Sequence, residues 1–126
     1  MIVGVGADIT EVRRIGELVD RHGERFLQRV FTADELAYAL DKGRRNEHLA
    51  ARFAAKEAVL KAIKTGVGPG TSLHEVEVVR GAKGEPEVRL HGCTARVAES
   101  KGVRHIHVSL SHTAEYGVAF VVCESE

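Results

Sequence analysis

A lysine and a carboxylate stand side by side inside the helical stretch RFAAKEAVLK (52–61), as Lys56 and Glu57. Projected at about 100° per residue, the apolar side chains of this stretch share one arc, with Lys56 inside the arc and Glu57 at its edge. Each position has an ordinary explanation of its own. The lysine can extend its ammonium from the core into water. Glu57 can pair with Lys61 one turn later, for about 0.2–0.5 kcal/mol.

A second isolated carboxylate, Asp8, follows the apolar run IVGVGA (2–7). A turn or capping aspartate is its ordinary explanation, because an unpaired acid is costly to bury. A magnesium–phosphate site would instead use Asp8 and Glu57 together, since Mg²⁺ usually takes one or two carboxylates and leaves other positions to water and phosphate oxygens. Basic side chains would neutralise the rest of a pyrophosphate. Between positions 42 and 64 there are seven of them against two Glu: Lys42, Arg44, Arg45, Arg52, Lys56, Lys61 and Lys64.

Two other patterns do not complete a nucleotide or metal site. Gly4 and Gly6 follow a predicted strand, but Ile9 occupies the position of the third glycine in a dinucleotide-binding turn. His105 and His107 could ligate a metal from one strand face. No cysteine or acid lies near them in the sequence, so we expect both to be ordinary outward polar residues.

The bulk composition indicates one neutral globular domain over residues 1–126. Eighteen Lys and Arg balance eighteen Asp and Glu, which argues against a general nucleic-acid or membrane binder. The start of the chain lacks the basic region of a signal peptide, and no apolar run approaches membrane-spanning length. We therefore expect a cytoplasmic protein. Cys93 and Cys123 match no metal or disulfide spacing and are expected to be buried, reduced thiols.

Helices are expected to dominate the first half of the chain. The run 2–7 shows no alternation and is predicted to be a strand buried on both faces. Thr10 is expected to cap the helix that follows, and Gly23 to separate it from a second helical piece. Residues 32–35, Thr-Ala-Asp-Glu, fit a capping box that begins a third helix. Asn46 is expected to cap the helix that carries Lys56 and Glu57.

Strands are expected to dominate the second half. After the Gly-rich segment 65–72 the hydrophobic period changes to two. The predicted elements are a hairpin over 74–80 and 86–91, a short helix over 93–100, and strands over 105–112 and 116–123. Helices followed by antiparallel strands predict an α+β domain, with helices packed on a small antiparallel sheet.

Four segments, in this order, resemble the holo-acyl-carrier-protein synthases, the short 4′-phosphopantetheinyl transferases. They are GADI (6–9), RFAAKEA (52–58), GEP (84–86) and HVSLSH (107–112). The family transfers the phosphopantetheine arm of coenzyme A to a serine of apo acyl carrier protein and releases adenosine 3′,5′-bisphosphate. The resemblance spans the chain. It implies the fold of the family, with helices packed on a small antiparallel sheet, and the transfer reaction just described.

The resemblance also implies a role for each matching residue. Asp8 and Glu57 would bind Mg²⁺, with Lys56 close by. Glu57, through a metal-bound water, would accept the serine proton, with His112 as the second candidate. The residues implied to contact coenzyme A are Arg44, Arg45, Arg52 and Lys61 at the phosphates, Pro86 at the adenine, and His107 and Ser109 along the nucleotide. The residues implied to dock the acidic carrier protein are Arg14, Arg21, Arg25, Phe26 and Arg29. Relatives of this type form homotrimers with active sites between subunits.

Two other classes of function compete with the transferase. A non-catalytic module that binds coenzyme A or a nucleotide would use the basic segment without needing both Asp8 and Glu57. An RNA-binding domain could use the arginines of the first helices. Aromatic residues make up only 5% of the chain, however, and no stacking platform is visible in the sequence.

Overall fold

The computed structural model describes every residue from 1 to 126. Its elements, in chain order, are β1 (Ile2–Glu11), α1 (Val12–His22), α2 (Glu24–Val30), α3 (Ala33–Asp41), α4 (Arg45–Ala62), the 3₁₀ turn η1 (Leu73–Glu75), β2 (Val76–Arg80), β3 (Pro86–Leu90), α5 (Gly92–Ser100), β4 (His105–His112) and β5 (Tyr116–Glu124). The predicted α+β class is confirmed.

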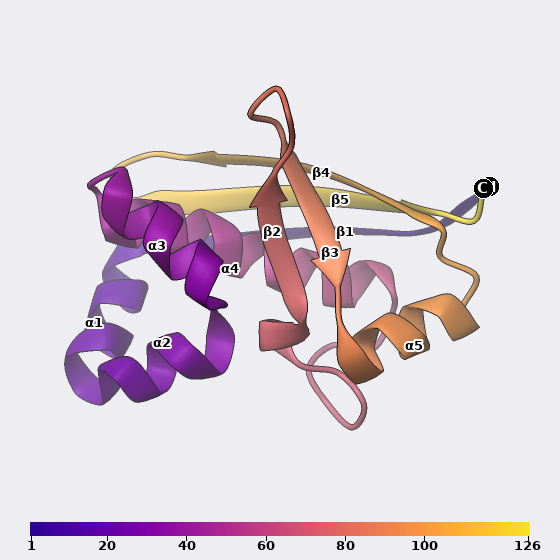
Figure 1. Cartoon of the computed structure of the whole chain (residues 1–126), viewed down its shortest axis with the longest axis horizontal. Helices are drawn as coiled ribbons and strands as arrows, with labels where there is room; N and C mark the ends of the chain where they lie inside the picture. Colours follow the sequence, from indigo (N-terminus) through magenta and orange to yellow (C-terminus); the bar gives the residue numbers. More distant parts are fainter.

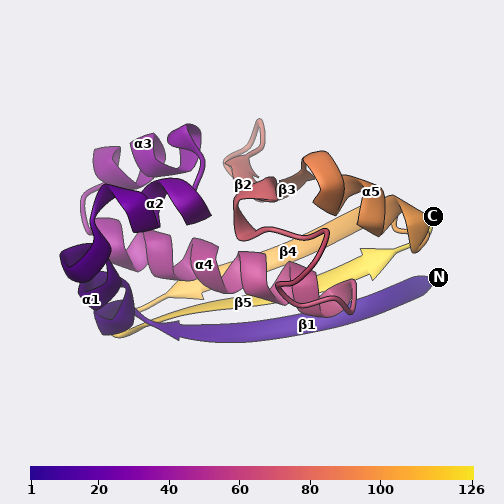
Figure 2. The ribbon, with the colours of Figure 1, turned by 90° about the horizontal axis from the view of Figure 1, so that it is seen from below.

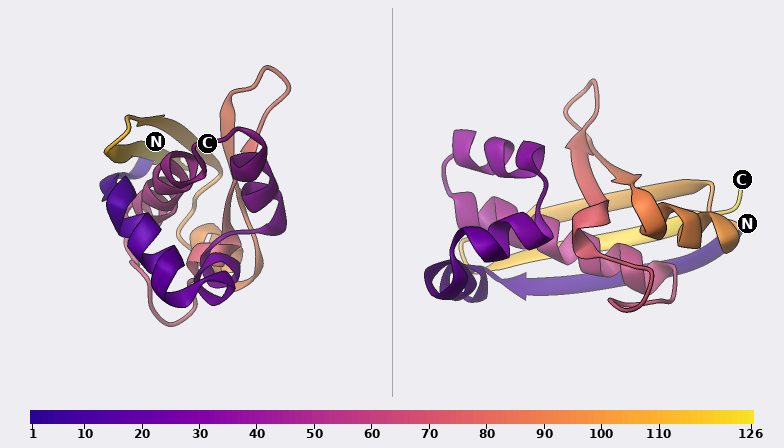
Figure 3. Two further views of the ribbon diagram at one scale, coloured as in Figure 1. Left: turned by 90° about the vertical axis from the view of Figure 1, so that its left-hand side faces the viewer. Right: turned by 60° about the horizontal axis from the view of Figure 1, so that its bottom comes forward.

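Helix α4 lies at the centre of the molecule, between two layers. Strands β1, β5 and β4 form an antiparallel sheet in that order, and β2 pairs with β3 in a separate antiparallel hairpin. Figure 2 shows α4 lying along one face of the three-stranded sheet. Seen from the end, α2, α3 and the hairpin lie on the other side of α4 (Figure 3). One helix therefore touches both the sheet and the hairpin layer.

Small residues let α4 approach the sheet closely. A Cβ atom added to Gly4 or Gly6 of β1 would collide with the carbonyl oxygen of Ala62 or Ala58. On the helix, the residues of this contact include fully buried alanines: Ala51, Ala54, Ala55, Ala58 and Ala62. The close contact brings the next inward residue of β1, Asp8, alongside α4.

The other face of the three-stranded sheet is not covered. In β1 the side chains of Ile2, Val5 and Ile9 are each more than half exposed. The neighbouring strand β5 exposes three further large apolar side chains, Tyr116, Val118 and Phe120. The prediction that residues 2–7 are buried on both faces is wrong for the single chain, because α4 covers only one face.

Two of the predicted helix caps are wrong and one is confirmed. β1 continues to Glu11 through its pairing with β5, so Thr10 is a buried strand residue and α1 has no side-chain cap. Helix α4 begins after Arg44, which has a left-handed backbone (φ 47°), and Asn46 falls inside its first turn. Thr32 and Glu35 form the predicted capping box at the start of α3.

The second half of the chain follows the prediction. The hairpin, the short helix and both final strands are present (Figure 1). β5 alternates between exposed and buried residues over most of its length, and β4 alternates between exposed and half-buried residues. Cys123 is buried as predicted, but Cys93 is exposed at the start of α5. No helix has both the length and the apolar character required to cross a bilayer.

Candidate functional site

Asp8 on β1 and Glu57 on α4 lie near each other where the strand meets the helix. The ammonium of Lys61 donates to Asp8 Oδ1 at 2.8 Å and to the carbonyl oxygen of Ala7 at 3.1 Å. Glu57, one turn earlier on α4, is half-buried and has no hydrogen bond or ion pair. Burial raises the pKa of Glu57, and the nearby charge of Asp8 raises it further. The two carboxylates are thus close together, and only Asp8 has a cationic partner.

This arrangement suits a divalent cation with few protein ligands. A cation between the two carboxylates would relieve the repulsion that raises the pKa of Glu57. No group of three or more His, Cys, Asp or Glu side chains could hold a metal ion. A site with two carboxylates and no nitrogen or sulfur ligand is typical of Mg²⁺, which fills its remaining positions with water and phosphate oxygens. The residues therefore fit the predicted metal.

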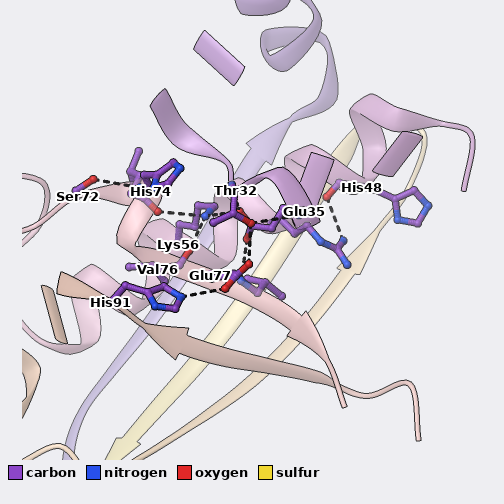
Figure 4. Close-up of polar contacts among 12 residues, drawn as sticks. Thr32, Glu35, His48, Lys56, Ser72, His74, Val76, Glu77 and His91 are labelled. Carbon is purple, nitrogen blue, oxygen red and sulfur yellow. Dashed lines mark hydrogen bonds and ion pairs between the residues drawn. The ribbon is translucent and has the colours of Figure 1, made fainter. Parts of the chain in front are cut away.

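Lys56 belongs to a different site. Its ammonium is fully buried, lies 2.7 Å from Glu35 Oε1, and also donates to the carbonyl oxygens of Leu73 and Val76. Figure 4 shows this lysine directed at α3 and β2. Extension of its ammonium into water is therefore wrong, and so is its placement beside Asp8 and Glu57. Consecutive residues on a helix point about 100° apart, so neighbours in the sequence can contact different layers.

Two arginines, Arg52 and Arg80, contact the ring of Tyr38 beneath the hairpin. The Arg52 guanidinium lies 4.3 Å from the Tyr38 ring centre, and the Arg80 guanidinium lies 5.0 Å from it. Arg80 also donates to the Tyr38 hydroxyl at 2.7 Å. Arg52 is only 1% exposed, and its Nε has no hydrogen-bond partner. Together with Asp34 and Arg89, these residues line a cavity of about 280 Å³.

This cavity has the electrostatics of an anion site. Burial lowers the pKa of Arg52, and the adjacent charge of Arg80 lowers it further. A bound anion would relieve both effects. Of these residues only Arg52 was predicted from the sequence. Tyr38, Arg80 and Arg89 come from α3, β2 and β3, and only the fold brings them together.

The other predicted coenzyme A residues are not gathered at either place within one chain. Arg44 and Arg45 line an open cavity of about 340 Å³ at the start of α4. His107 lies on the exposed side of β4, with Nε2 2.6 Å from Glu124 Oε1, and Ser109 is exposed on the same face. Pro86 begins β3, opposite Arg80.

His112 does not reach the carboxylates in the single chain. Its Nδ1 lies 3.0 Å from Glu47 Oε1, and its ring lies 4.8 Å from that of His48. β5 separates β4, which carries His112, from β1, which carries Asp8. Burial lowers the pKa of His48, as does the charge of His112. Within one chain, His112 is therefore not placed to accept a proton at the site of Asp8 and Glu57.

The predicted docking residues lie on α1 and α2. Arg25, Phe26 and Arg29 line a shallow cavity of about 220 Å³ together with His22. The Phe26 ring packs edge-on against Phe31, with ring centres 6.1 Å apart, so it is half-buried rather than free. The two other predicted residues, Arg14 and Arg21, lie on the preceding helix α1. Arg14 is close enough to Glu57 to oppose the increase in its pKa.

Known proteins match this chain over nearly its whole length. The family model described as the 4′-phosphopantetheinyl transferase superfamily matches residues 4–121. A holo-[acyl-carrier-protein] synthase of Koribacter versatilis is 48% identical over 124 residues, which are 98% of this chain and 99% of that protein. A second such synthase, from Solibacter usitatus, is 46% identical and covers 99% of this chain and 100% of its own length.

Solved structures of relatives share the fold of this chain. The holo-[acyl-carrier-protein] synthase of Neisseria meningitidis superposes with a TM-score of 0.90 at 35% identity, covering 98% of this chain and 99% of the other. The synthase of Helicobacter pylori, solved in complex with coenzyme A, superposes with a TM-score of 0.84 at 28% identity. That match covers 95% of this chain and 99% of the other.

Proposed function

The chain belongs to the 4′-phosphopantetheinyl transferase superfamily, and from this membership we infer that it acts as a holo-[acyl-carrier-protein] synthase. The enzyme transfers 4′-phosphopantetheine from coenzyme A to a serine of apo acyl carrier protein and releases adenosine 3′,5′-bisphosphate. The observation that carries this inference in the structure is the convergence of Asp8 and Glu57 from β1 and α4.

We propose that Asp8 and Glu57 hold the magnesium ion that the reaction needs. When bound, Mg²⁺ would supply neutralisation and orientation of the pyrophosphate. The rest of the work falls to side chains. Lys61, now paired with Asp8, would donate to a phosphate oxygen. Glu57 is the proposed acceptor of the serine proton, because its carboxylate would lie beside the bound pyrophosphate, where the serine attacks.

The cavity around Arg52, Arg80 and Arg89 is the proposed site for a second phosphate of coenzyme A. That substrate carries a pyrophosphate, where the bond breaks, and a separate 3′-phosphate on its ribose. The cavity lies beneath the hairpin, whereas Asp8 and Glu57 lie where β1 meets α4, so we assign the 3′-phosphate to the cavity and the pyrophosphate to the two carboxylates. A crystal structure of a Bacillus anthracis relative is described as a complex with coenzyme A (3′,5′-ADP). Arg44 and Arg45 would add positive charge at the start of α4.

The uncovered sheet face supports the association of copies that the family resemblance implies, which is a homotrimer. Monomeric proteins rarely expose large continuous apolar patches, and here Ile9 is 61% exposed and Phe120 is 51% exposed on adjacent strands. We propose that this face packs against other copies of the chain. His107 and Ser109 on the exposed face of β4 would then contribute to the nucleotide position of an adjacent subunit.

The docking surface for the carrier protein is proposed on α1 and α2. Arg14, Arg21, Arg25 and Arg29 would attract an acidic partner, with Phe26 as the apolar contact. Arg25→Glu is expected to weaken binding of the carrier protein far more than binding of coenzyme A. Calorimetry with each ligand separates the two, and equal losses would contradict the assignment.

The proposed function is tested by incubating the protein with apo carrier protein, coenzyme A and Mg²⁺, followed by intact-mass measurement of the carrier. A gain equal to one phosphopantetheine group, abolished by EDTA and restored by Mg²⁺, is the expected result. A module that only binds coenzyme A would show heat of binding without any change in the mass of the carrier. That outcome would overturn the transferase.

A further inference from the structure

Lys56 and Glu35 form an ion pair with no solvent exposure on either side chain. The Lys56 ammonium has three N–H groups, and its three acceptors are Glu35 Oε1, the Leu73 carbonyl and the Val76 carbonyl. The two carbonyls lie at the first residue of η1 and the first residue of β2. The lysine therefore binds the chain at the point where the hairpin begins.

Glu35 binds the same strand two residues further on. Its Oε2 accepts the Val78 N–H at 2.7 Å, and its Oε1 accepts the Thr32 N–H at 2.9 Å. The Thr32 hydroxyl then donates to Glu77 Oε2 at 2.8 Å, and Glu77 Oε1 lies 2.9 Å from His91 Nε2. Figure 4 shows this continuous network between α3, α4 and the hairpin.

Helix α4 carries a functional residue on each side of this pair. Glu57 follows Lys56 directly and faces β1, whereas Arg52 precedes it by one turn and contacts Tyr38 beneath the hairpin. Arg80 and Arg89 stand on the hairpin itself, whose turn projects from the body of the molecule (Figure 1). The distance between the cavity and Glu57 thus depends on how the hairpin sits against α4.

We propose that Lys56 is a positioning residue for coenzyme A. With Glu35 it fixes the hairpin against α4, so that Arg80 and Arg89 hold the ribose 3′-phosphate while the pyrophosphate lies at Asp8 and Glu57. This inference rests on the proposed function and on the proposed phosphate site around Arg52. Stability alone is a weak reason for such a pair, because well-packed apolar residues often replace a buried ion pair without loss.

The test compares coenzyme A with dephospho-coenzyme A, which lacks only the 3′-phosphate. The variant is Lys56→Met combined with Glu35→Gln, which leaves no buried charge without a partner. The wild type is expected to prefer coenzyme A by about tenfold or more in KM, since the 3′-phosphate makes charge-assisted hydrogen bonds. The double variant is expected to lose most of this preference through a higher KM for coenzyme A. Its kcat at saturating coenzyme A stays within about threefold of the wild-type value, because Glu57 is unchanged.

Two comparisons make the outcome decisive. Cys123→Ala removes a buried side chain at the far end of β5 and controls for general destabilisation, so it should keep the wild-type preference. If it loses the preference too, the positioning role is overturned. Arg89→Ala tests the phosphate site itself, because Arg89 is outside the Lys56–Glu35 network. If Arg89→Ala abolishes the preference and the double variant keeps it, the phosphate site stands and the positioning role is wrong.

The remaining outcomes are equally clear. An intact preference in Arg89→Ala would overturn both the phosphate site and the role of Lys56. If the double variant does not fold, Glu35→Asp, which keeps the charge beside Lys56 but shortens the side chain, is measured in the same way. A preference equal to that of the wild type would then overturn the inference, and a reduced preference at normal kcat would support it.

Discussion

The two sides of helix α4 differ in how completely their charged side chains are paired. On the side of β1, Glu57 has no partner, and Asp8 shares its charge only with the half-exposed Lys61. On the side of the hairpin, Lys56 and Glu35 are fully buried, and each makes several hydrogen bonds. Incompletely paired charges are available to a ligand, whereas fully paired ones hold backbone segments in place. The comparison separates residues that act on the substrate from residues that position them.

The largest expected effect is on the side of β1. Glu57→Gln is expected to keep the fold and to lower phosphopantetheine transfer by about 10²–10⁴-fold, since it removes both a metal ligand and the proposed base. The rate is measured by intact mass of the carrier protein, with a Mg²⁺ titration. Glu11→Gln, the same change at an exposed carboxylate at the end of β1, should leave the rate unchanged. Normal transfer by Glu57→Gln would show that the side of α4 facing β1 does not act on the substrate.

On the side of the hairpin the expected effect is on stability. Lys56→Met leaves Glu35 buried without its cation, which should cost about 3–5 kcal/mol of unfolding free energy. Adding Glu35→Gln should recover most of this loss, because the unpaired charge is then gone. Urea unfolding at fixed protein concentration measures both variants. A single variant as stable as the wild type would show that this pair does not hold the hairpin.

A smaller effect is expected where β1 meets the helix. Gly6→Ala adds a Cβ that collides with the Ala58 carbonyl, so β1 must move away from α4. The expected loss is about 1–3 kcal/mol of stability, with weaker Mg²⁺ binding because Asp8 moves away from Glu57. Gly68→Ala is the control, since a Cβ there meets nothing within 4 Å. Unchanged Mg²⁺ affinity in the Gly6 variant would show that the close contact does not set the carboxylate separation.

The sequence was informative where chemistry depends on local pattern. Asp8, Glu57 and Lys61 were found because acids and bases in an apolar context are conspicuous, and the structure places all three together. The partner of Lys56 was missed, because Glu35 lies on another helix and no periodicity links the two. The β-branched residues of 2–7 predict a strand buried on both faces. Within one chain, however, α4 covers only one face of β1.

The free energy of unfolding should change with pH in opposite directions for the carboxylates on the two sides of α4. This is the smallest of the expected effects. Burial and Asp8 raise the pKa of Glu57 above its ordinary 4.5, so the folded protein keeps a proton that the unfolded chain has lost. This contribution to stability is present below pH 4.5 and is lost as the pH rises through the raised pKa. Burial also opposes ionisation of Glu77, but hydrogen bonds from Thr32 and His91 outweigh it and lower its pKa.

The contribution of Glu77 is therefore present above its ordinary pKa and is lost as the pH falls through the lowered value. Unfolding free energies measured across the acid range should separate the two carboxylates. Glu57→Gln should remove the decline in stability with rising pH, and Glu77→Gln should lower stability near neutral pH. Mg²⁺ favours ionised Glu57. Adding Mg²⁺ should therefore make the Glu57 contribution to stability increase with rising pH in the wild type, and should have no such effect in Glu57→Gln. Slopes of the same sign in the two variants would contradict the division of α4 into an unpaired functional side and a paired positioning side.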